Sequence, residues 1–498
     1  MLEKAGLNGI RLLVALALTA CLGAGLASSA LAKRPAGLDK SFGKQGRVVV
    51  NTTARSETVL PGIPGAVAEA SASGPGGRLY VASGQRVLGF LANGRHDPRF
   101  DSVELAVPAG STFLLGGIAV DSAGRVLVAG VTQSGTAAPG PAAPGPAAPP
   151  PASAAVYRFL PSGQPDPSFG IGGEVVSSFG QLPPTGPGPA GKYPFTPVPG
   201  NEFPYSTATL RVAGVAVDRD DRPVVSGASV NHVTACTAGI GGSPFTAYQT
   251  RTFVARLTSG GIPDASFGSG GVLTDDYYES PIGPATTSEG GVALANPTEG
   301  PCLVIPEDKP ATISVLNPDG SLAHRFFSRE EAGSQAERRL QTAAIAVDHR
   351  NRIVTLANEI SGSGETAATE ATVVSRWLPS GRPDRNFGHG GFEEFDLGRS
   401  ALSALAIDDH NRAVLAGSAA RRGGGRSFLV MRLTATGMAD SRFGRGGQTT
   451  TGFLTTSKAA AASVSLDERG RIVLGGTLTS PLLKTGYGLA LARYMGGN

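Results

Sequence analysis

The sequence predicts an all-β fold assembled from repeated four-stranded units, on three observations. The 498 residues include 71 Gly and 37 Pro, together about 22% of the chain, against an ordinary usage of about 12%, and both residues break helices. Two short motifs alternate along the chain with a period of about 60 residues. Each repeat holds four short apolar runs separated by turn residues. Such a period in an all-strand unit is typical of β-propeller blades.

The overall composition is that of a globular chain and gives no indication of a nucleic-acid partner. Hydrophobic residues make up 41% of the sequence, which is enough for a packed core. The 43 Lys and Arg residues nearly balance 39 Asp and Glu residues, for a net charge of +4, so we expect no nucleic-acid partner. Three cysteines exclude both a disulfide-dense scaffold and a multi-cysteine metal cluster.

The first residues have the features of an export signal. Lys4 and Arg11 form a basic start, an apolar run follows over residues 12–26, and Ala30-Leu31-Ala32 is a small-x-small cleavage pattern. We therefore expect a signal peptide over residues 1–32 and a single mature domain over residues 33–498, located outside the cytoplasm as a secreted or cell-envelope protein. The apolar run is short for a membrane span, and no later stretch approaches its length.

A second interpretation of the same segment stays open. Leu18-Thr19-Ala20-Cys21 resembles a bacterial lipobox, in which the cysteine becomes the lipidated first residue of a lipoprotein. Cys21 is thus a candidate lipidation site, and a lipid anchor is the alternative to free secretion. Both interpretations predict export and no transmembrane span.

The first repeated motif is a strand that ends in a tight turn. It reads apolar-Ala-apolar-Asp, with an Arg four residues after the Asp and then a second apolar run. Five clear copies carry Asp121, Asp218, Asp348, Asp408 and Asp467, and two worn copies lie near residues 67–83 and 292–305. The interval from Asp348 to Asp408 is 60 residues and that from Asp408 to Asp467 is 59. We expect the Asp and Asn side chains to cap these turns, with Gly or Asn at positive φ.

The second motif, clearest at residues 158–176, joins the third strand to the fourth. It reads Arg-apolar-x-x-x-Gly-x-x-Asp-x-x-Phe-Gly-x-x-Gly-x-Val. Its phenylalanine recurs in every unit, at Phe42, Phe100, Phe169, Phe267, Phe326, Phe387 and Phe443. We interpret this residue as a buried wedge between neighbouring blades, where its burial contributes roughly 2 kcal/mol.

The two ends of the chain complement each other. In the Asp408 unit the expected strands are residues 405–407, 413–416, 428–433 and 448–453. The last unit stops after its third strand, residues 489–494, and the mature chain begins with the missing fourth, residues 37–50. The sequence therefore predicts a seven-bladed β-propeller of four-stranded antiparallel blades, closed by the N-terminal strand, which removes exposed sheet edges.

The alternation of these two motifs resembles the delta-60 repeat β-propeller family of exported bacterial proteins. The resemblance covers roughly residues 37–494, with insertions, and the first and fourth copies of the first motif depart from the pattern. It implies a propeller fold and an extracytoplasmic setting. It implies no activity, because a fold does not fix a function.

Variable segments gather in two of the four connections of a unit. Ala/Pro-rich residues 131–155 and residues 228–251 join second to third strands, and Pro/Gly-rich residues 179–208 and residues 275–290 and 328–341 join fourth strands to the next unit. These connections lie on one face of a propeller, where binding surfaces usually form. The candidate binding residues there are Tyr193, Phe195, Phe203, Tyr205, Tyr277 and Tyr278. The alternative is that these runs are solvated linkers.

The sequence shows no nucleophile elbow, no His-Glu-x-x-His and no phosphate-binding loop. We therefore name no catalytic residue, metal or cofactor. His349, His410 and His389 fall in turns and are interpreted as surface residues. The turn cluster Asp218, Asp220 and Asp221 is a weak calcium candidate, since calcium takes several oxygen ligands.

Cysteine and tryptophan residues lead to two further expectations for the mature domain. Cys236 and Cys302 lie in consecutive units, and export permits oxidation, so they are a candidate disulfide, with two free thiols as the alternative. Trp377 follows Arg376 on a third strand, where a core or inter-blade position is expected.

These observations favour an exported, noncatalytic, monomeric propeller that binds a protein or glycan through its long-loop face. One alternative is a propeller enzyme of the lyase or lactone hydrolase type, but the inner strands, which read Ile-Ala-Val, Val-Ala-Val, Leu-Ala-Ile and Val-Ser-Leu, offer few ionisable groups to the channel. The other alternative is a purely structural envelope protein.

Overall fold

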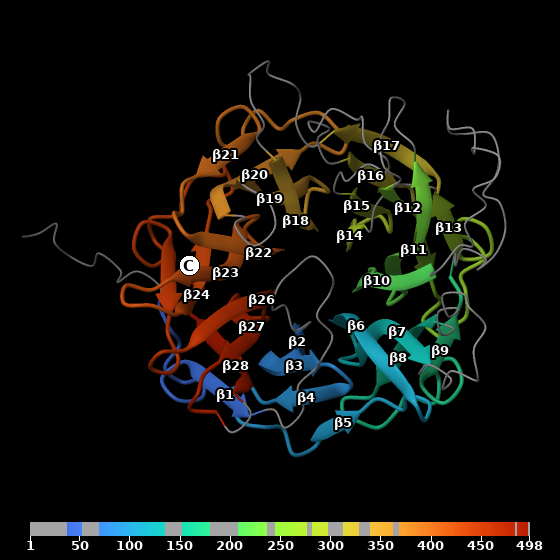
Figure 1. Ribbon diagram of the computed structural model, residues 1–498, viewed down its shortest axis with the longest axis horizontal. Coiled ribbons are helices and arrows are strands. Elements are labelled where there is room, and N and C mark those ends of the chain that lie inside the picture. Colours follow the sequence, from blue (N-terminus) through green and yellow to red (C-terminus); the bar gives the residue numbers. More distant parts are fainter. Residues whose placement is uncertain are drawn as a thin grey trace, which may run out of the picture.

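The chain forms β-sheets arranged around a common centre, as the computed structural model shows (Figure 1). The structure describes residues 37–51, 69–134, 152–179, 208–236, 245–275, 281–296, 312–327, 339–361, 368–483 and 486–496. Within these ranges the regular structure is all strand apart from one short 3-10 turn, η1 (Pro75–Gly77). No helix in this part of the chain is long and apolar enough to cross a membrane.

Five sheets contain four antiparallel strands, paired in the order in which they follow along the chain. The first two sheets consist of β2 (Glu69–Gly74), β3 (Arg78–Ser83), β4 (Arg86–Phe90) and β5 (Ser102–Glu104), and of β6 (Ser111–Val120), β7 (Val126–Ser134), β8 (Ala152–Phe159) and β9 (Glu174–Ser177). The third consists of β10 (Ala208–Val217), β11 (Pro223–Cys236), β12 (Phe245–Arg256) and β13 (Val272–Asp275). The last two consist of β14 (Ile282–Thr286), β15 (Val292–Asn296), β16 (Thr312–Leu316) and β17 (Leu322–Phe327), and of β18 (Arg339–Val347), β19 (Ile353–Ser361), β20 (Ala368–Trp377) and β21 (Phe392–Phe395).

The sixth sheet has eight strands and contains both the first and the last strand described. One half consists of β22 (Ser400–Ile407), β23 (Ala413–Ala420), β24 (Arg426–Arg432) and β25 (Gln448–Thr451). The other half consists of β26 (Lys458–Leu466), β27 (Ile472–Thr479), β28 (Tyr487–Tyr494) and β1 (Arg47–Asn51). A single parallel pairing, Arg426 with Lys458, joins the halves. β1 pairs antiparallel with β28, with Arg47 opposite Ala492.

This pairing confirms the predicted all-β propeller with four-stranded antiparallel blades. The structure differs from the prediction of seven separate blades, because five four-stranded sheets and one eight-stranded sheet are present. The difference rests on one residue pair, Arg426 with Lys458, where the start of β26 lies beside the start of β24.

The hydrophobic core lies between neighbouring sheets. The first strand of each four-stranded set lies nearest the centre, and β2, β6, β10, β14, β18, β22 and β26 contact one another in succession, with β26 contacting β2 again (Figure 1). One cluster combines Leu127 and Val156 of the β6–β9 sheet with Val225 and Phe253 of the β10–β13 sheet. Each sheet is therefore stabilised by the next one, as in repeat architectures whose units share their cores.

The recurring phenylalanine occupies this space between sheets, as the sequence predicted. Six of its seven copies are at most 2% exposed, namely Phe42, Phe100, Phe169, Phe267, Phe387 and Phe443. The Phe387 ring lies against Gly437 in the turn of the next four-stranded unit, where a Cβ would come within 3.0 Å of the ring. Gly437 also has a φ of +89°, so both the ring and the backbone require glycine there. Phe326, in the worn fourth copy, is only partly buried.

The first-to-second strand turns also follow the prediction. Asp408 Oδ1 accepts hydrogen bonds from the backbone N–H groups of His410 (3.0 Å) and Arg412 (2.9 Å). Asn411 completes the turn with a φ of +57°, a conformation that asparagine tolerates better than most residues. The turn is thus specified by its own side chains.

We predict that replacing one buried wedge destabilises the protein far more than replacing an exposed phenylalanine of the same sheet. Phe387→Ala removes a ring that is 1% exposed and should lower the free energy of unfolding by about 3–5 kcal/mol. Phe392→Ala, at a position that is 46% exposed, is the matched control and should change it by less than about 1 kcal/mol. Urea denaturation measures both, and equal effects of the two substitutions would contradict the wedge interpretation.

Candidate functional site

The strand order sorts the connections of the propeller into two ends. The turn end comprises the links from first to second strands and from third to fourth strands, such as residues 121–125 and 160–173 in the β6–β9 sheet. The loop end comprises the links from second to third strands and from each fourth strand to the next unit, such as residues 421–425 and 452–457. Every internal break in the described chain falls at the loop end.

The residues that sequence reasoning proposed for binding, disulfide formation and lipidation lie outside the described residues. These are Tyr193, Phe195, Phe203, Tyr205, Tyr277, Tyr278, Cys302 and Cys21, together with the signal peptide. Cys236 is the last residue of β11, with its backbone opposite Phe245. Nothing in the described chain brings these residues together or separates them, so all of these assignments stay predictions.

Two predicted insertions are shorter than expected. Residues 131–134 belong to β7 and residues 152–155 to β8, and most of the 228–251 segment extends β11 and β12. The pairing of β11 with β12 continues from Val224 opposite Arg256 as far as Cys236 opposite Phe245. Val, Thr and aromatic residues in this segment favour strand over loop, and sequence reasoning gave too much weight to its departure from the motif.

The turn end is held by buried ion pairs that repeat around the molecule. The Arg of the third strand donates from Nε to the Asp of the following turn in five units, at 2.8–2.9 Å. The pairs are Arg158 with Asp166, Arg256 with Asp264, Arg376 with Asp384, Arg432 with Asp440 and Arg493 with Asp39. Each guanidinium also lies over the wedge ring of its own unit, 4.4–4.8 Å from the ring centroid, where cation–π attraction adds to the pair.

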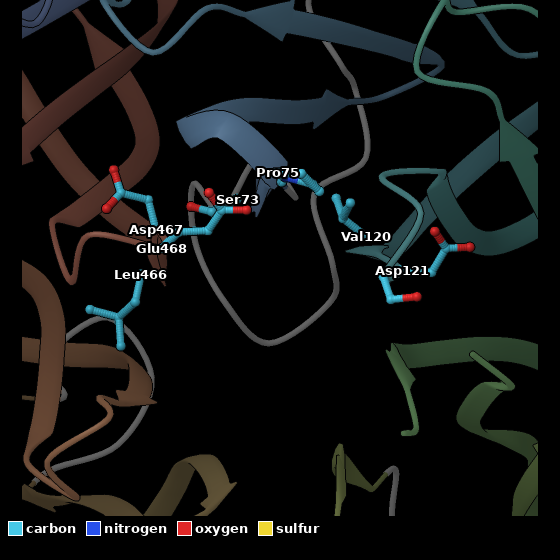
Figure 2. Close-up of a pocket in the computed structure, with 9 residues that line it drawn as sticks. Ser73, Pro75, Val120, Asp121, Leu466, Asp467 and Glu468 are labelled. Atoms are coloured by element: carbon cyan, nitrogen blue, oxygen red, sulfur yellow. The ribbon is translucent and has the colours of Figure 1, made fainter. Parts of the chain in front are cut away.

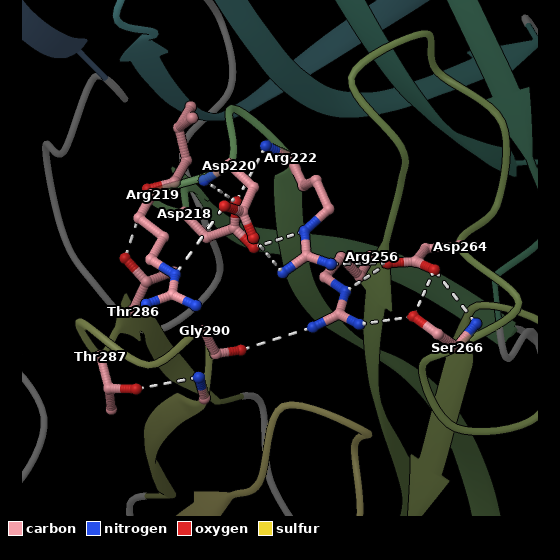
Figure 3. A network of polar contacts seen from close by, with 12 residues as sticks. Asp218, Arg219, Asp220, Arg222, Arg256, Asp264, Ser266, Thr286, Thr287 and Gly290 are labelled. Carbon is pink, nitrogen blue, oxygen red and sulfur yellow. Dashed lines mark hydrogen bonds and ion pairs between the residues drawn. The ribbon is translucent and has the colours of Figure 1, made fainter.

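A second Arg, from the first motif, joins each of these pairs. In the β10–β13 sheet, Arg222 donates from Nε to Asp218 at 2.8 Å and reaches Asp264 with Nη1 at 3.4 Å (Figure 3). The same arrangement links Arg352 with both Asp348 and Asp384, at 2.7 Å and 3.1 Å. Two cations and two anions per unit leave little net charge inside the turn end, which is the condition under which buried charges are tolerated.

All of these arginines except Arg432 also connect neighbouring sheets. Arg376 Nη1 donates to the backbone carbonyl of Ala435 in the next unit at 2.6 Å. Arg158 bonds Ser259 of the next sheet in the same way, and Arg493 bonds Ala92. Sequence reasoning named these arginines as part of the motif and missed this role. The sequence held evidence for this role. The Arg and the Asp recur at a constant spacing beside the buried phenylalanine, and a buried charge must be neutralised by a partner.

The electrostatics of the pairs favour their charged forms. Burial alone raises the pKa of Asp166, but hydrogen bonds from Ser168 and the positive charge of Arg158 outweigh it and hold that pKa below its ordinary value. The pKa of Asp264 is lowered by the same balance, with Ser266 and Arg256 as partners. Both carboxylates therefore stay ionised at neutral pH.

The two worn copies lack this ionic arrangement. In the first unit Gly89 stands where the third-strand Arg would be, and the ion pair that Asp97 forms within the described chain is with Arg78, at 3.4 Å. In the fourth unit Val315 occupies the Arg position and Thr287 replaces the turn Asp, so its turn is held by a hydrogen bond from the Gly291 N–H to the Thr287 hydroxyl at 2.8 Å.

The cluster considered for calcium is used by other contacts. Asp218 accepts hydrogen bonds from the Asp220 N–H (3.0 Å) and from Arg222. Asp220 forms an ion pair with Arg222 at 3.0 Å, and Asp221 accepts both the N–H and the hydroxyl of Ser122 in the preceding sheet. Asp218 and Asp220 thus share Arg222 as a partner, Asp221 pairs with Ser122, and each carboxylate strengthens a turn or an inter-sheet contact.

Three histidines and the tryptophan lie where the sequence placed them. His349, His389 and His410 are exposed in turns, and His389 Nδ1 lies 2.7 Å from Glu393. Trp377 is 4% exposed and packs on Phe326, with ring centroids 5.2 Å apart. Among these residues only Trp377 contributes to the core.

A small cavity opens at the turn end, between η1 and the turns that follow β6 and β26 (Figure 2). Its volume is about 260 Å³, and Asp121, Asp467 and Glu468 contribute carboxylates to its wall. Asp121 and Asp467 are paired with their own arginines, and Glu468 accepts the Gly76 N–H at 3.1 Å. The cavity lies where the first unit has the short η1 turn, and its carboxylates take part in structural contacts.

No protein-family model and no curated protein matches this chain. Similar solved structures include a gluconolactonase from Xanthomonas campestris, 14% identical, which covers 77% of this chain and 92% of its own with a TM-score of 0.32. A glucose dehydrogenase is 10% identical over 86% of this chain and 96% of its own, with a TM-score of 0.34. A chain of the mitotic checkpoint complex is 10% identical over 94% and 96%, with a TM-score of 0.41. At these identities and scores, the likenesses carry no argument about what this chain does.

We predict that acid destabilises the protein through these pairs. The folded-state pKa values of Asp39, Asp166, Asp264 and Asp384 lie below the ordinary value. Their contribution to stability is therefore complete above about pH 4, the unfolded pKa, and is lost as the pH falls through the folded values. The urea midpoint should stay nearly level down to about pH 4 and fall below it, and a midpoint that stays constant from about pH 4 to about pH 2 would contradict the prediction. Asp384→Asn is the comparison and should show a lower midpoint at pH 7 with a shallower acid dependence.

A second prediction concerns Arg432, whose Nη1 and Nη2 are buried and find no partner in the described chain. In three other units Nη2 donates to a serine hydroxyl two residues after the Asp, as Arg158 does to Ser168 at 3.1 Å. Arg442 occupies that position in this unit. Arg442→Ser should supply the hydroxyl and stabilise the protein by about 1 kcal/mol, measured as a higher urea midpoint. Arg445→Ser, an equal change of charge in the same turn, should not, and equal gains from both would contradict the assignment.

Proposed function

We propose that this chain is an exported, noncatalytic propeller of the delta-60 repeat type that binds a protein or glycan through its loop end. The observation that carries the proposal is the division of the molecule into two ends. Strand pairing puts the connections of variable length at one end, and the repeated ion pairs of the five regular units lie at the other. Variable connections on a rigid scaffold are the usual place of recognition surfaces.

The proposal includes a closed ring of seven blades, in which the eight-stranded sheet counts as two. Two contacts support it. β1 supplies a fourth strand to β26–β28 through its pairing with β28, and the innermost strands contact one another in an unbroken succession that returns from β26 to β2. A closed ring suits a binding scaffold, because it fixes the loop ends of the blades relative to one another and leaves only the short outer edges of the blades unpaired.

The aromatic residues predicted for the loop end extend the proposal. Tyr193, Phe195, Phe203, Tyr205, Tyr277 and Tyr278 belong by sequence to connections at this end. Tyrosine and phenylalanine supply large contact areas in recognition of proteins and sugars. Export through the signal over residues 1–32, with Cys21 as the alternative lipid anchor, would put this surface in contact with envelope glycans and surface proteins.

The test is a binding screen of the purified chain against envelope polysaccharides and extracted surface proteins. A variant in which residues 135–151 and 180–207 are each replaced by a five-residue Gly/Ser link, about as long as the described 421–425 connection, should lose most of the binding. A turn-end variant, His349→Ala with His410→Ala, is the control and should retain it. An unchanged melting temperature shows that the trimmed variant is folded.

Three outcomes would contradict the proposal. Binding that survives the trimming but is lost in the turn-end control would move recognition to the other end. Turnover of a bound ligand by the purified chain would favour an enzyme of the lyase or lactone hydrolase type. The absence of any binding to either class of partner would favour a purely structural envelope role.

A further inference from the structure

Three connections at the loop end of the eight-stranded sheet touch one another. They are residues 396–399 before β22, residues 421–425 between β23 and β24, and residues 452–457 before β26. Ser400 pairs with Ala419, which puts the first connection beside the second. Arg421 Nη1 donates to the Leu454 carbonyl at 3.3 Å, and the Arg426 N–H donates to the Ser457 carbonyl at 3.1 Å, so the second connection also contacts the third.

This junction concentrates positive charge. The cationic patch, as we name it, consists of Arg399, Arg421, Arg422, Arg426 and Lys458. Four of these side chains are exposed and Arg426 is half-buried. The three connections and their flanking residues contain one carboxylate, Asp396, whose Oδ1 accepts the Gly398 N–H at 2.9 Å. Five like charges beside a single opposite one repel each other. The structural ion pairs of the turn end do not include these five cations.

Arg426 differs from the buried arginines of the turn end. Each of those is paired with an aspartate, whereas the guanidinium of Arg426 donates, among the described residues, only to Ser418, from Nε at 3.0 Å and from Nη2 to the hydroxyl at 2.8 Å. Burial lowers the pKa of Arg426, and no carboxylate of the described chain offsets this effect. A half-buried guanidinium without a carboxylate has unused attraction for an anion.

The backbone beside these arginines is open. Residues 421–426 read Arg-Arg-Gly-Gly-Gly-Arg, and Gly423, Gly424 and Gly425 have φ values of +86°, +97° and +84°. A Cβ on Gly423 or Gly424 would meet no atom within 4 Å. Gly423 and Gly424 therefore leave free space beside the Arg421–Arg422 pair, where a ligand group can approach the main chain, whereas Gly425 lies against the Ser457 carbonyl.

We propose that the cationic patch binds the carboxylate or sulfate groups of an acidic polysaccharide. This inference rests on the proposed function and names the ligand class for the loop end. Guanidinium groups present a planar fork that matches carboxylate and sulfate oxygens, and four of the five cations are arginines. Their distribution over three connections provides several anionic subsites, as a polymer with one charge per sugar residue requires.

The same observations favour a polysaccharide over an anionic membrane surface. Stable attachment to a lipid surface needs apolar side chains that insert beside the cations. Phe453 and Leu454, the apolar residues of the third connection, pack against the hydrophobic core of the sheet, and Phe453 contacts Phe428 with ring centroids 4.8 Å apart. The patch thus offers charge and hydrogen-bond donors to a polar ligand.

The test measures binding of the purified chain to polygalacturonate and to heparin, with neutral dextran and phosphatidylglycerol vesicles as comparison ligands. The proposal expects binding to one or both acidic polysaccharides, little to dextran, and weakening as NaCl rises from 0.05 to 0.5 M, since salt screens exposed charges. Arg421→Gln with Arg422→Gln should raise the Kd at least about tenfold. Because both side chains are exposed, the melting temperature should stay unchanged.

Two further variants sharpen the test. Arg442→Gln with Arg445→Gln removes the same charge from exposed positions at the turn end of the same sheet and should leave the Kd unchanged. Arg421→Lys with Arg422→Lys keeps the charge and loses the planar fork, so it should weaken binding by an intermediate factor. Equal weakening by the turn-end and loop-end glutamine variants would overturn the proposal, since it would reveal a response to net charge alone.

The remaining outcomes separate this inference from the proposed function. One such outcome is tight binding of a neutral glycan or a protein that is lost on trimming of residues 135–151 and 180–207 but kept in Arg421→Gln with Arg422→Gln. It would overturn the acidic-ligand inference and leave the proposed function intact. Preference for the vesicles over both acidic polysaccharides would overturn the ligand class. Binding of every ligand at the turn end would overturn both the acidic-ligand inference and the proposed function.

Discussion

The buried Arg–Asp pair of the turn end is the interaction on which the rest of the structure depends. In five units the third-strand Arg neutralises its turn Asp, lies over the wedge phenylalanine and, in Arg158, Arg376 and Arg493, donates to a carbonyl of the next unit. One side chain thereby links a turn, an inter-sheet ring and a neighbouring sheet. Loss of one partner would leave an unpaired buried charge, which is among the costliest defects in a protein interior.

This arrangement explains why the two ends of the molecule differ. Because the turns and wedges already fix the position of each sheet, the connections at the other end are free to differ in length and composition. Charge follows the same division. The buried arginines of the turn end have aspartate partners, whereas the half-buried Arg426 of the cationic patch has none among the described residues. This guanidinium at the loop end therefore has unused capacity for an anionic ligand.

Much of the fold could be predicted from the sequence, because its determinants are local and repeated. The wedge at Phe387, the cap at Asp408 and the positive φ at Asn411 each follow from residues within one turn. The shared pairing of Arg426 with Lys458 could not be predicted in this way, since it depends on how two half-sheets approach across a short connection. The extended pairing of β11 with β12 was missed because an interrupted motif was interpreted as a loop.

The aromatic binding site that the sequence suggested stays a prediction, because its residues lie outside the described chain. Sequence reasoning did not name the cations of the short connections. Arg399, Arg421 and Lys458 are spread over 60 residues of sequence, and each alone resembles an ordinary solvated side chain. Only the register of β22 with β23 and the contact with residues 452–457 bring them to one surface.

The most direct test of this account is amide hydrogen exchange of the purified chain with and without a bound acidic polysaccharide. The account predicts new protection at residues 397–400, 420–427 and 452–459, with unchanged exchange in the turn over residues 433–447 of the same sheet. Protection confined to that turn, or to the inner strands around the centre, would contradict the division between a structural turn end and a binding loop end.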